Sequence, residues 1–285
     1  MSAPLEWVQA PGKLNLFLHV LGRRAGGTSA GMHELQTVFR LIDRGDRVGV
    51  AVRKDGDVRF SGPFGNENLC VKAATLLKQE TRTVLGCDIA LEKILPVGGG
   101  LGGGSSDAAS VLLALNRLWR TGLKRGRLME LGARLGADVP FFVFGENALG
   151  EGFGERLSRL QLAPAWYLVL TPQVSVSTKE IFSDAALTRD TKPLTMAPFL
   201  SGQGRNDLEP IALRRYPEIA EHLAWLRKRS PRGAFAPRMT GSGACVFAEF
   251  PRQADAVALH GQLPPAMRGF VARGLELHPL HDWAN

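Results

Sequence analysis

One stretch decides the fold of this chain: Pro96-Val97-Gly98-Gly99-Gly100-Leu101-Gly102-Gly103-Gly104-Ser105-Ser106-Asp107. Glycine loses the most conformational entropy on folding. Six glycines in seven residues therefore disfavour folding, and such a run is expected only where the backbone itself has a function. A helix should follow, because apolar side chains recur at helical spacing over Ala108, Val111, Leu112, Leu115 and Trp119. A glycine loop that opens onto a helix N-terminus presents free N–H groups and the positive end of a dipole. The stretch therefore predicts an anion site, and phosphate is the anion we expect.

Other glycine motifs fit this stretch less well. A flexible turn with a polar N-cap at 105–107 needs only one or two glycines. Residues 98–103 match the dinucleotide pattern G-x-G-x-x-G, but a basic, structure-breaking segment, 121–126, stands where that motif needs an acid. No Lys follows the glycines as in G-x-x-x-x-G-K-[ST], and the H-R-D and D-F-G sequences of protein kinases are missing. A phosphate loop of a different kind remains.

The composition is typical of a globular protein. The 285 residues are 45% hydrophobic and 22% charged, enough for one large or two ordinary domains. No apolar run reaches the roughly 20 residues of a membrane span, and the first residues do not resemble a signal peptide. Cys70, Cys87 and Cys245 lie far apart in apolar surroundings, as reduced core cysteines do, and without metal-ligand spacing. We therefore expect a cytoplasmic protein with no membrane partner and no metal ligands among its cysteines.

The net charge of +8 makes nucleic acid a partner to consider. The basic residues are scattered, apart from Arg23-Arg24 and 227–229, and aromatic residues do not alternate with them. This distribution favours solvated helix faces and attraction for a small polyanion over a nucleic acid partner.

Two charged residues outside the loop each have two interpretations, one structural and one functional. The alternating segment 10–21 predicts a strand, with Lys13 and Asn15 on its second face near the start. Lys13 is either a solvated edge residue or a cation held beside an anionic ligand. Asp138 precedes an apolar segment, 139–144, which we expect to be a strand. The acid either turns the chain before Pro140 or acts as a positioned base.

The remaining elements follow from the same periodicities. His33, at the end of a glycine-containing loop, is expected from its position at the surface, and Thr178 is expected as a helix N-cap. The glycine turn at 239–243 is either a hairpin turn or a turn that approaches another loop closely. Further strands are expected over 32–42, 48–53, 57–60, 87–94, 166–172, 246–250 and 270–277. Helices are expected over 67–78, 127–135, 206–210 onward, 217–229 and 251–263, and residues 188–205 are expected to be irregular.

Three segments, in order along the chain, resemble the GHMP kinase superfamily of galacto-, homoserine, mevalonate and phosphomevalonate kinases. They are 11–16, 96–106 and 239–243. Within it, further segments resemble the branch that phosphorylates a diphosphocytidyl methylerythritol in non-mevalonate isoprenoid synthesis. These are Lys13-Leu14-Asn15-Leu16, His33 with Leu35-Gln36-Thr37, residues 136–142, and Asn206-Asp207-Leu208-Glu209-Pro210. The resemblance covers essentially the whole chain.

The resemblance implies an α+β fold of two domains with the active site in the cleft between them. An ATP-binding, catalytic domain would span 1–155 and a substrate-binding domain 156–285. ATP would donate its γ-phosphoryl group to the 2-hydroxyl of the cytidine diphosphate substrate, giving the 2-phosphate and ADP. Mg²⁺ is expected with ATP, held largely by phosphates and water; Ser105 or Ser106 could add an oxygen, but the sequence establishes no protein ligand. The sequence does not indicate an oligomeric state.

The resemblance also implies roles for individual residues. Asp138 would be the catalytic acid–base residue and Lys13 its partner. The ATP site would comprise Pro96, Val97, Gly98, Gly99, Gly100, Leu101, Gly102, Gly103, Gly104, Ser105 and Ser106, with Asn68, Leu69 and Lys93 beside the adenine. In the substrate site, Asn15 would contact the polyol, His33 would read the cytosine, and Phe182 would stack on it with Thr178 nearby.

One position departs from the branch. Met32 stands where the branch has a Tyr, after a longer loop at 25–31. The cytosine would then lie between Met32 and Phe182 rather than between two aromatic rings.

Two other functions agree with parts of the sequence. A different GHMP kinase, such as a mevalonate or homoserine kinase, would keep the loop and change the acceptor pocket. A basic RNA-binding protein would explain the charge but leaves the six glycines without a task.

Overall fold

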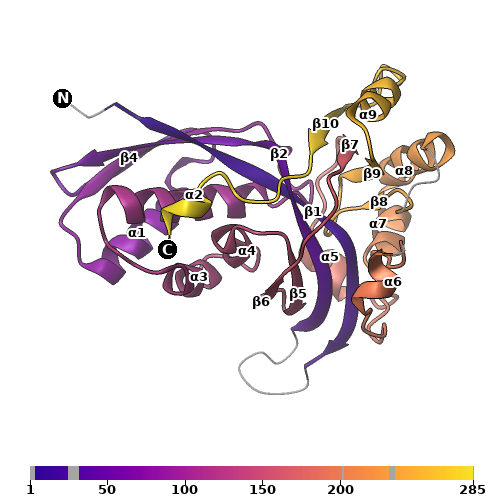
Figure 1. Ribbon diagram of the computed structural model, residues 1–285, viewed down its shortest axis with the longest axis horizontal. Helices are drawn as coiled ribbons and strands as arrows, with labels where there is room; N and C mark the ends of the chain where they lie inside the picture. Colours follow the sequence, from indigo (N-terminus) through magenta and orange to yellow (C-terminus); the bar gives the residue numbers. More distant parts are fainter. Residues whose placement is uncertain (1–3, 25–31, 201, 231–234, 285) are drawn as a thin grey trace.

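A long antiparallel ribbon of two strands runs through the molecule (Figure 1). The computed structural model describes residues 4–24, 32–200, 202–230 and 235–284. In the ribbon, β1 (Glu6–Arg23) pairs with β2 (His33–Arg53) along nearly its whole length. The two strands expected at 32–42 and 48–53 are therefore one strand. Gly45 allows this close pairing, since a Cβ there would lie 2.2 Å from the carbonyl oxygen of Ala10.

The ribbon belongs to a six-stranded sheet in the first half of the chain. The order is β3-β4-β2-β5-β6, and β1 pairs with β2. The other strands are β3 (Val58–Ser61), β4 (Gly86–Glu92), β5 (Ala148–Gly152) and β6 (Arg156–Arg159). The helices of this half are α1 (Leu69–Thr81), α2 (Gly103–Leu118), α3 (Arg125–Ala133) and α4 (Val139–Phe144).

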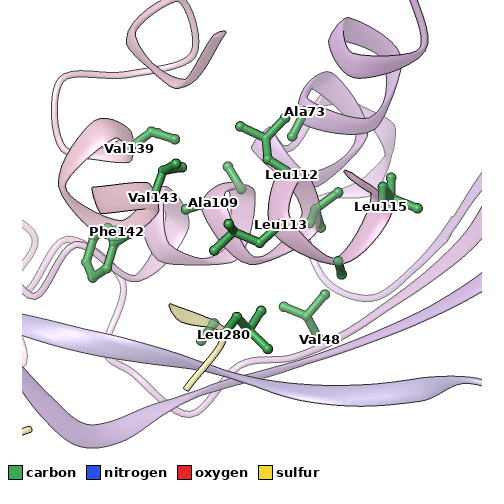
Figure 2. Close-up of a cluster of buried hydrophobic side chains, with 14 of the residues drawn as sticks. Val48, Ala73, Ala109, Leu112, Leu113, Leu115, Val139, Phe142, Val143 and Leu280 are labelled. Carbon is green, nitrogen blue, oxygen red and sulfur yellow. The ribbon is translucent and has the colours of Figure 1, made fainter. Parts of the chain in front are cut away.

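Helix α2 is the centre of the first hydrophobic core (Figure 2). Every residue from Ser106 to Asn116 is buried, and so is Trp119 at the C-cap, so the whole apolar stripe that the sequence predicts is buried. The labelled side chains of α2 lie among Val48 of the sheet, Ala73 of α1, and Val139, Phe142 and Val143 of α4. A helix buried all round is fixed by its neighbours, so the loop before it is held in place as well.

The apolar segment at 139–144 forms the short helix α4, so the prediction of a strand there is wrong. Pro140 lies in its first turn, where a missing N–H costs nothing. Gly145 closes the helix in a left-handed conformation with φ of 78°, and its N–H donates to Phe141 O at 3.0 Å. Six apolar residues do not distinguish a buried strand from a buried helix by periodicity, but the Pro and Gly at its ends favour a helix.

In its described residues, the second half of the chain contains a four-stranded antiparallel sheet, five α-helices and the short 3-10 helix η2 (His281–Trp283). The sheet order is β10-β7-β9-β8. The strands are β7 (Trp166–Leu170), β8 (Arg238–Met239), β9 (Val246–Phe250) and β10 (Gly269–Arg273). The helices are α5 (Thr178–Ser183), α6 (Met196–Leu200), α7 (Glu209–Arg215), α8 (Pro217–Arg229) and α9 (Gln253–His260).

Two local expectations in this half are wrong. Thr178 is the first residue of α5 rather than its N-cap, because the hydroxyl of Ser177 accepts the N–H of Glu180. The segment expected to be irregular, 188–205, contains α6.

The chain ends against its own first half. The segment after β10 pairs with residues of that half at the bridges Ile42–Gly274 and Glu146–Leu277. Leu280 lies in the first core, and in Figure 1 the C-terminus lies beside α2. The boundary between 155 and 156 stays a prediction.

The composition-based expectations have direct structural counterparts. Cys70, Cys87 and Cys245 are buried and form no disulfide, as predicted. None of the described helices is long and apolar enough to cross a membrane.

Candidate functional site

The glycine loop has a backbone that only glycine adopts easily. Gly98, Gly100 and Gly102 have φ values of 69°, 75° and 72°. A side chain at Gly100 would also place its Cβ 2.2 Å from the carbonyl oxygen of Thr240. The glycines therefore allow both the turn of the loop and its close approach to the second glycine turn, 239–243.

The carbonyl groups of the loop point into the protein. Gly98 O and Gly99 O accept the N–H groups of Ala244 and Cys245 at 3.2 and 3.1 Å, and Leu101 O accepts that of Lys13 at 2.9 Å. Over the ranges that the structure describes, the N–H groups from Gly98 to Ser105 have no protein acceptor. A row of oriented, unpaired N–H groups at a helix start binds an anion, as the sequence predicts.

Helix α2 begins inside the glycine run. Gly102 is its N-cap residue, so none of the polar residues 105–107 caps it. Gly103, in the first turn, leaves room for two charged groups, since a Cβ there would lie 3.1 Å from both Asp46 Oδ2 and Lys93 Nζ.

A buried ionic cluster supports the loop from below. The Lys93 ammonium donates to Asp46 Oδ2 and, at 2.8 Å, to Asp107 Oδ2. The second oxygen of Asp46 accepts the N–H groups of Ile94 and Leu95 at 2.6 and 2.8 Å, where the chain enters the loop. Asp46 and Asp107 were missed as site residues, because an acid in a strand and an acid in a helix carry no signal of their shared lysine.

Burial raises the pKa of Asp107 to about 7, despite the opposing effect of Lys93, and the nearby Asp46 adds to the rise. Burial alone would lower the pKa of Lys93, but Asp107 and Asp46 outweigh it and raise that pKa. The cluster therefore holds its lysine charged and favours the protonated form of Asp107 more than water would.

The loop separates two cavities. One, of about 410 Å³, is lined by the loop from Pro96 to Ser105 and by Asn68, Leu69 and Lys93. Asn68 also caps α1, because its Oδ1 accepts the N–H groups of Cys70 and Val71. The loop and the three residues predicted to lie beside it therefore share one cavity. Ser106 is buried beneath this surface, and its hydroxyl has no partner within the described part of the chain.

The other cavity, of about 310 Å³, lies between the two halves of the chain. Gly98, Gly100, Gly102 and Ser105 line both cavities, so the loop is their common wall. Lys13, Asn15, Asp138, Thr178 and Phe182, all predicted site residues, line this second cavity.

Lys13 and Asp138 form an ion pair in the second cavity. The distance from Lys13 Nζ to Asp138 Oδ2 is 3.4 Å; the Lys13 side chain is 4% exposed and that of Asp138 is 34% exposed. Lys13 Nζ also donates to Asn15 Oδ1 at 2.5 Å, and Asn15 Nδ2 donates to the hydroxyl of Thr37 at 2.8 Å. Lys13 is thus a buried, positioned cation, which rules out the solvated edge residue. Thr37 was not predicted as a site residue, although its segment, Leu35-Gln36-Thr37, resembles the branch.

His33 lies beside this cavity without lining it. Its ring is 5.0 Å from that of Phe182, and the Nε of Arg189 donates to His33 Nε2 at 3.0 Å. It is half-buried, and so partly exposed, as a position at the surface allows. Met32 is 46% exposed, and the loop 25–31 before it lies outside the described residues. Thr178 is hydrogen-bonded to Ser242 of the glycine turn at 2.7 Å.

The described residues contain no group of three or more His, Cys, Asp or Glu that could hold a metal ion.

Comparisons with known proteins agree with these features. The model of the GHMP kinases N terminal domain matches residues 68–146, and that of the GHMP kinases C terminal matches residues 192–267. The 4-diphosphocytidyl-2-C-methyl-D-erythritol kinase of Nitrosospira multiformis is 54% identical over 279 residues, covering 96% of this chain and 93% of its own. That of Thiobacillus denitrificans is also 54% identical, covering 96% and 97%.

Solved structures show the same fold. A crystal structure of 4-(cytidine 5'-diphospho)-2C-methyl-D-erythritol kinase has a TM-score of 0.83 at 34% identity, covering 94% of this chain and 99% of its own. Homoserine kinase from Cytophaga hutchinsonii, at 15% identity and a TM-score of 0.69, covers 98% and 96% and shares the fold alone. The predicted α+β fold of this superfamily is confirmed, and the chain belongs to the GHMP kinase family.

Proposed function

We propose that this chain is the kinase that transfers the γ-phosphoryl group of ATP to the 2-hydroxyl of 4-diphosphocytidyl-2-C-methyl-D-erythritol. The products are the 2-phosphate and ADP. The observation that carries the proposal is the ion pair between the buried Lys13 and the partly exposed Asp138, which lies beside a glycine loop shared by two cavities. Relatives more than 50% identical over nearly the whole chain bear the name of this activity.

ATP occupies the cavity lined by Asn68, Leu69 and Lys93, with its triphosphate along the loop 96–106. Support comes from the unpaired N–H groups of Gly98 to Ser105 and from the dipole of α2, both of which favour phosphate oxygens. Mg²⁺, when bound to the phosphates, supplies further charge neutralisation. The buried, unpartnered hydroxyl of Ser106 at this helix start is an available oxygen donor.

The acceptor hydroxyl binds in the second cavity beside Asp138. The acceptor oxygen forms a bond to the γ-phosphorus, and the bond from that phosphorus to the bridging oxygen of ADP breaks. Asp138 receives the hydroxyl proton, and the partial exposure of its carboxylate to the cavity supports this role. Lys13, held by Asn15, places a fixed positive charge beside the oxygens of the transferring group.

The diphosphocytidyl part of the acceptor lies toward Phe182 and His33. Asn15 contacts the polyol, Phe182 stacks on the cytosine, Met32 covers its other face, and Thr178 lies alongside. The aromatic wall that Phe182 gives the cavity supports a stacked base. Residues 1–155 then form the ATP-binding, catalytic domain, and 156–285 form the substrate-binding domain, which contributes Thr178 and Phe182 to the acceptor site. The unbonded, buried cysteines support a reducing compartment such as the cytoplasm.

Coupled measurement of ADP tests the function. Purified protein receives ATP and Mg²⁺ with the diphosphocytidyl substrate, with mevalonate, with homoserine, or with no acceptor. ADP should form at a high rate with the first acceptor only, in equal amounts with the 2-phosphate. Faster turnover of mevalonate or homoserine would identify a different acceptor and refute the proposal.

A further inference from the structure

Arg189, in the segment after α5, donates to four acceptors. Its Nη2 donates to the carbonyl oxygens of Phe182 at 2.9 Å and Asp184 at 2.8 Å, and Nη1 to that of Leu187 at 3.1 Å. Its Nε donates to Nε2 of His33 at 3.0 Å. One side chain therefore ties the end of α5 to the first residue of β2.

This contact determines the protonation of His33. A guanidinium is only a donor, so Nε2 of His33 must accept, and the proton of the neutral imidazole is then on Nδ1. Burial lowers the pKa of His33, and the positive charges of Arg189 and Arg23 lower it further. These two arginines are the charged groups that act on the imidazole, and both favour its neutral form at pH 7.

We propose that Arg189 is a positioning residue for recognition of the acceptor base. It fixes His33 in the neutral form with the proton on Nδ1 and holds the ring beside Phe182. The inference rests on the proposed function, in which these two residues contact the cytosine. Cytosine offers acceptors at N3 and O2, and Nδ1–H of His33 is a matching donor.

The tautomer can be measured without substrate. Ring ¹⁵N spectra of the wild-type protein, recorded from about pH 5 to pH 8, distinguish a protonated from an unprotonated ring nitrogen. We expect His33 to carry its proton on Nδ1 at neutral pH and to titrate below the usual range for His. A proton on Nε2 at neutral pH overturns the proposal, and this remains decisive where the variants below do not fold.

The variant Arg189→Met tests the effect on recognition. We expect the KM for the diphosphocytidyl substrate to rise about tenfold, the effect of one lost charge-assisted hydrogen bond, with kcat and the KM for ATP within about twofold. The pKa of His33 should also rise, so that this KM becomes pH-dependent near neutrality, unlike that of the wild type.

Arg214→Met is the matched control. Arg214 also supports the end of α5, through a 2.8 Å hydrogen bond from Nη2 to Asp184 Oδ1, but it does not contact His33. Its substrate KM and His33 titration should stay at wild-type values. Equal KM increases in the two variants, or a parallel fall in kcat for Arg189→Met, would make Arg189 a structural residue only.

The two proposals fail in different measurements. Wild-type protein that forms no ADP with the diphosphocytidyl substrate refutes the proposed function, and with it the role of Arg189 in recognition. A wrong tautomer in a fully active enzyme refutes the role of Arg189 alone.

Discussion

The proposed active site has two walls, and each binds its ligand with a different kind of group: backbone groups on the donor wall and side chains on the acceptor wall. On the donor side, the backbone from Gly98 to Ser105 presents the binding groups, and a Cβ at Gly99, Gly100 or Gly102 would come within 3.0 Å of a neighbouring atom. On the acceptor side, the binding groups are side chains such as Lys13, Asp138 and Phe182, drawn from both halves of the chain. A backbone site recognises a charge and shape common to all nucleoside triphosphates, whereas side chains distinguish one acceptor from another. This explains how relatives of one fold keep a donor and change an acceptor.

The largest expected effect is on the acceptor wall. Asp138→Ala should lower kcat by about 10²–10⁴-fold, because the acceptor hydroxyl loses its proton acceptor. ATP affinity, set by the backbone of the other wall, should stay nearly unchanged. Steady-state kinetics and ATP titration measure the two quantities separately. A kcat close to wild type would refute the role of Asp138 in proton transfer.

The next largest effect is expected from a substitution in the donor wall. In Gly100→Ala, the new Cβ meets the carbonyl oxygen of Thr240 at a left-handed φ, so the loop must move. We expect a loss of about 1–3 kcal/mol of stability and a 10–100-fold weaker ATP affinity. The matched control is Gly126→Ala in α3, where a Cβ has open space. Thermal unfolding should show it equal to or more stable than wild type. Similar behaviour of the two variants would contradict the close packing of the loop.

The ionic cluster below the donor wall predicts a pH dependence of stability. The folded-state pKa of Asp107, about 7, lies above its usual value, so the native state binds more protons than the unfolded state from about pH 4 to 7. Its contribution to stability is therefore present at low pH and falls as the pH rises, by at most about 1.4 kcal/mol per unit. Asp107→Asn should remove this slope, as measured by urea unfolding at several pH values. An unchanged slope would assign the effect to other groups.

The smallest expected effect is tighter substrate binding from a substitution in the acceptor wall. Met32→Tyr should lower the KM for the diphosphocytidyl substrate about three- to tenfold, because a second aromatic face gains stacking energy with the base. The KM for ATP should not change. An unchanged substrate KM would mean that residue 32 does not reach the base.

The sequence predicted the donor side better than the acceptor side, for a physical reason. A site made of consecutive backbone groups must appear as a continuous pattern, and the run from Gly98 to Gly104 is that pattern. The pairing of Lys13 with Asp138 was accessible only through the resemblance to a family, since the two residues are 125 positions apart in the sequence. The partners Asp46, Thr37 and Arg189 were missed because each contact is formed by folding between segments far apart in the chain. Over 139–144 the apolar periodicity did not distinguish a strand from a helix. In the folded chain this segment is a helix buried against α2.

The hydrogen bonds from Ala244 and Cys245 to the glycine loop have a consequence for biosynthesis. Two carbonyl groups of the loop are held by residues 244 and 245, so we expect the loop to reach its folded shape only when the late part of the chain is present. A nascent first half on the ribosome, although it contains every glycine of the loop, is then expected to bind nucleotide more weakly than the full chain. On this expectation, nucleotide capture is a late event in synthesis and reports that both halves have come together.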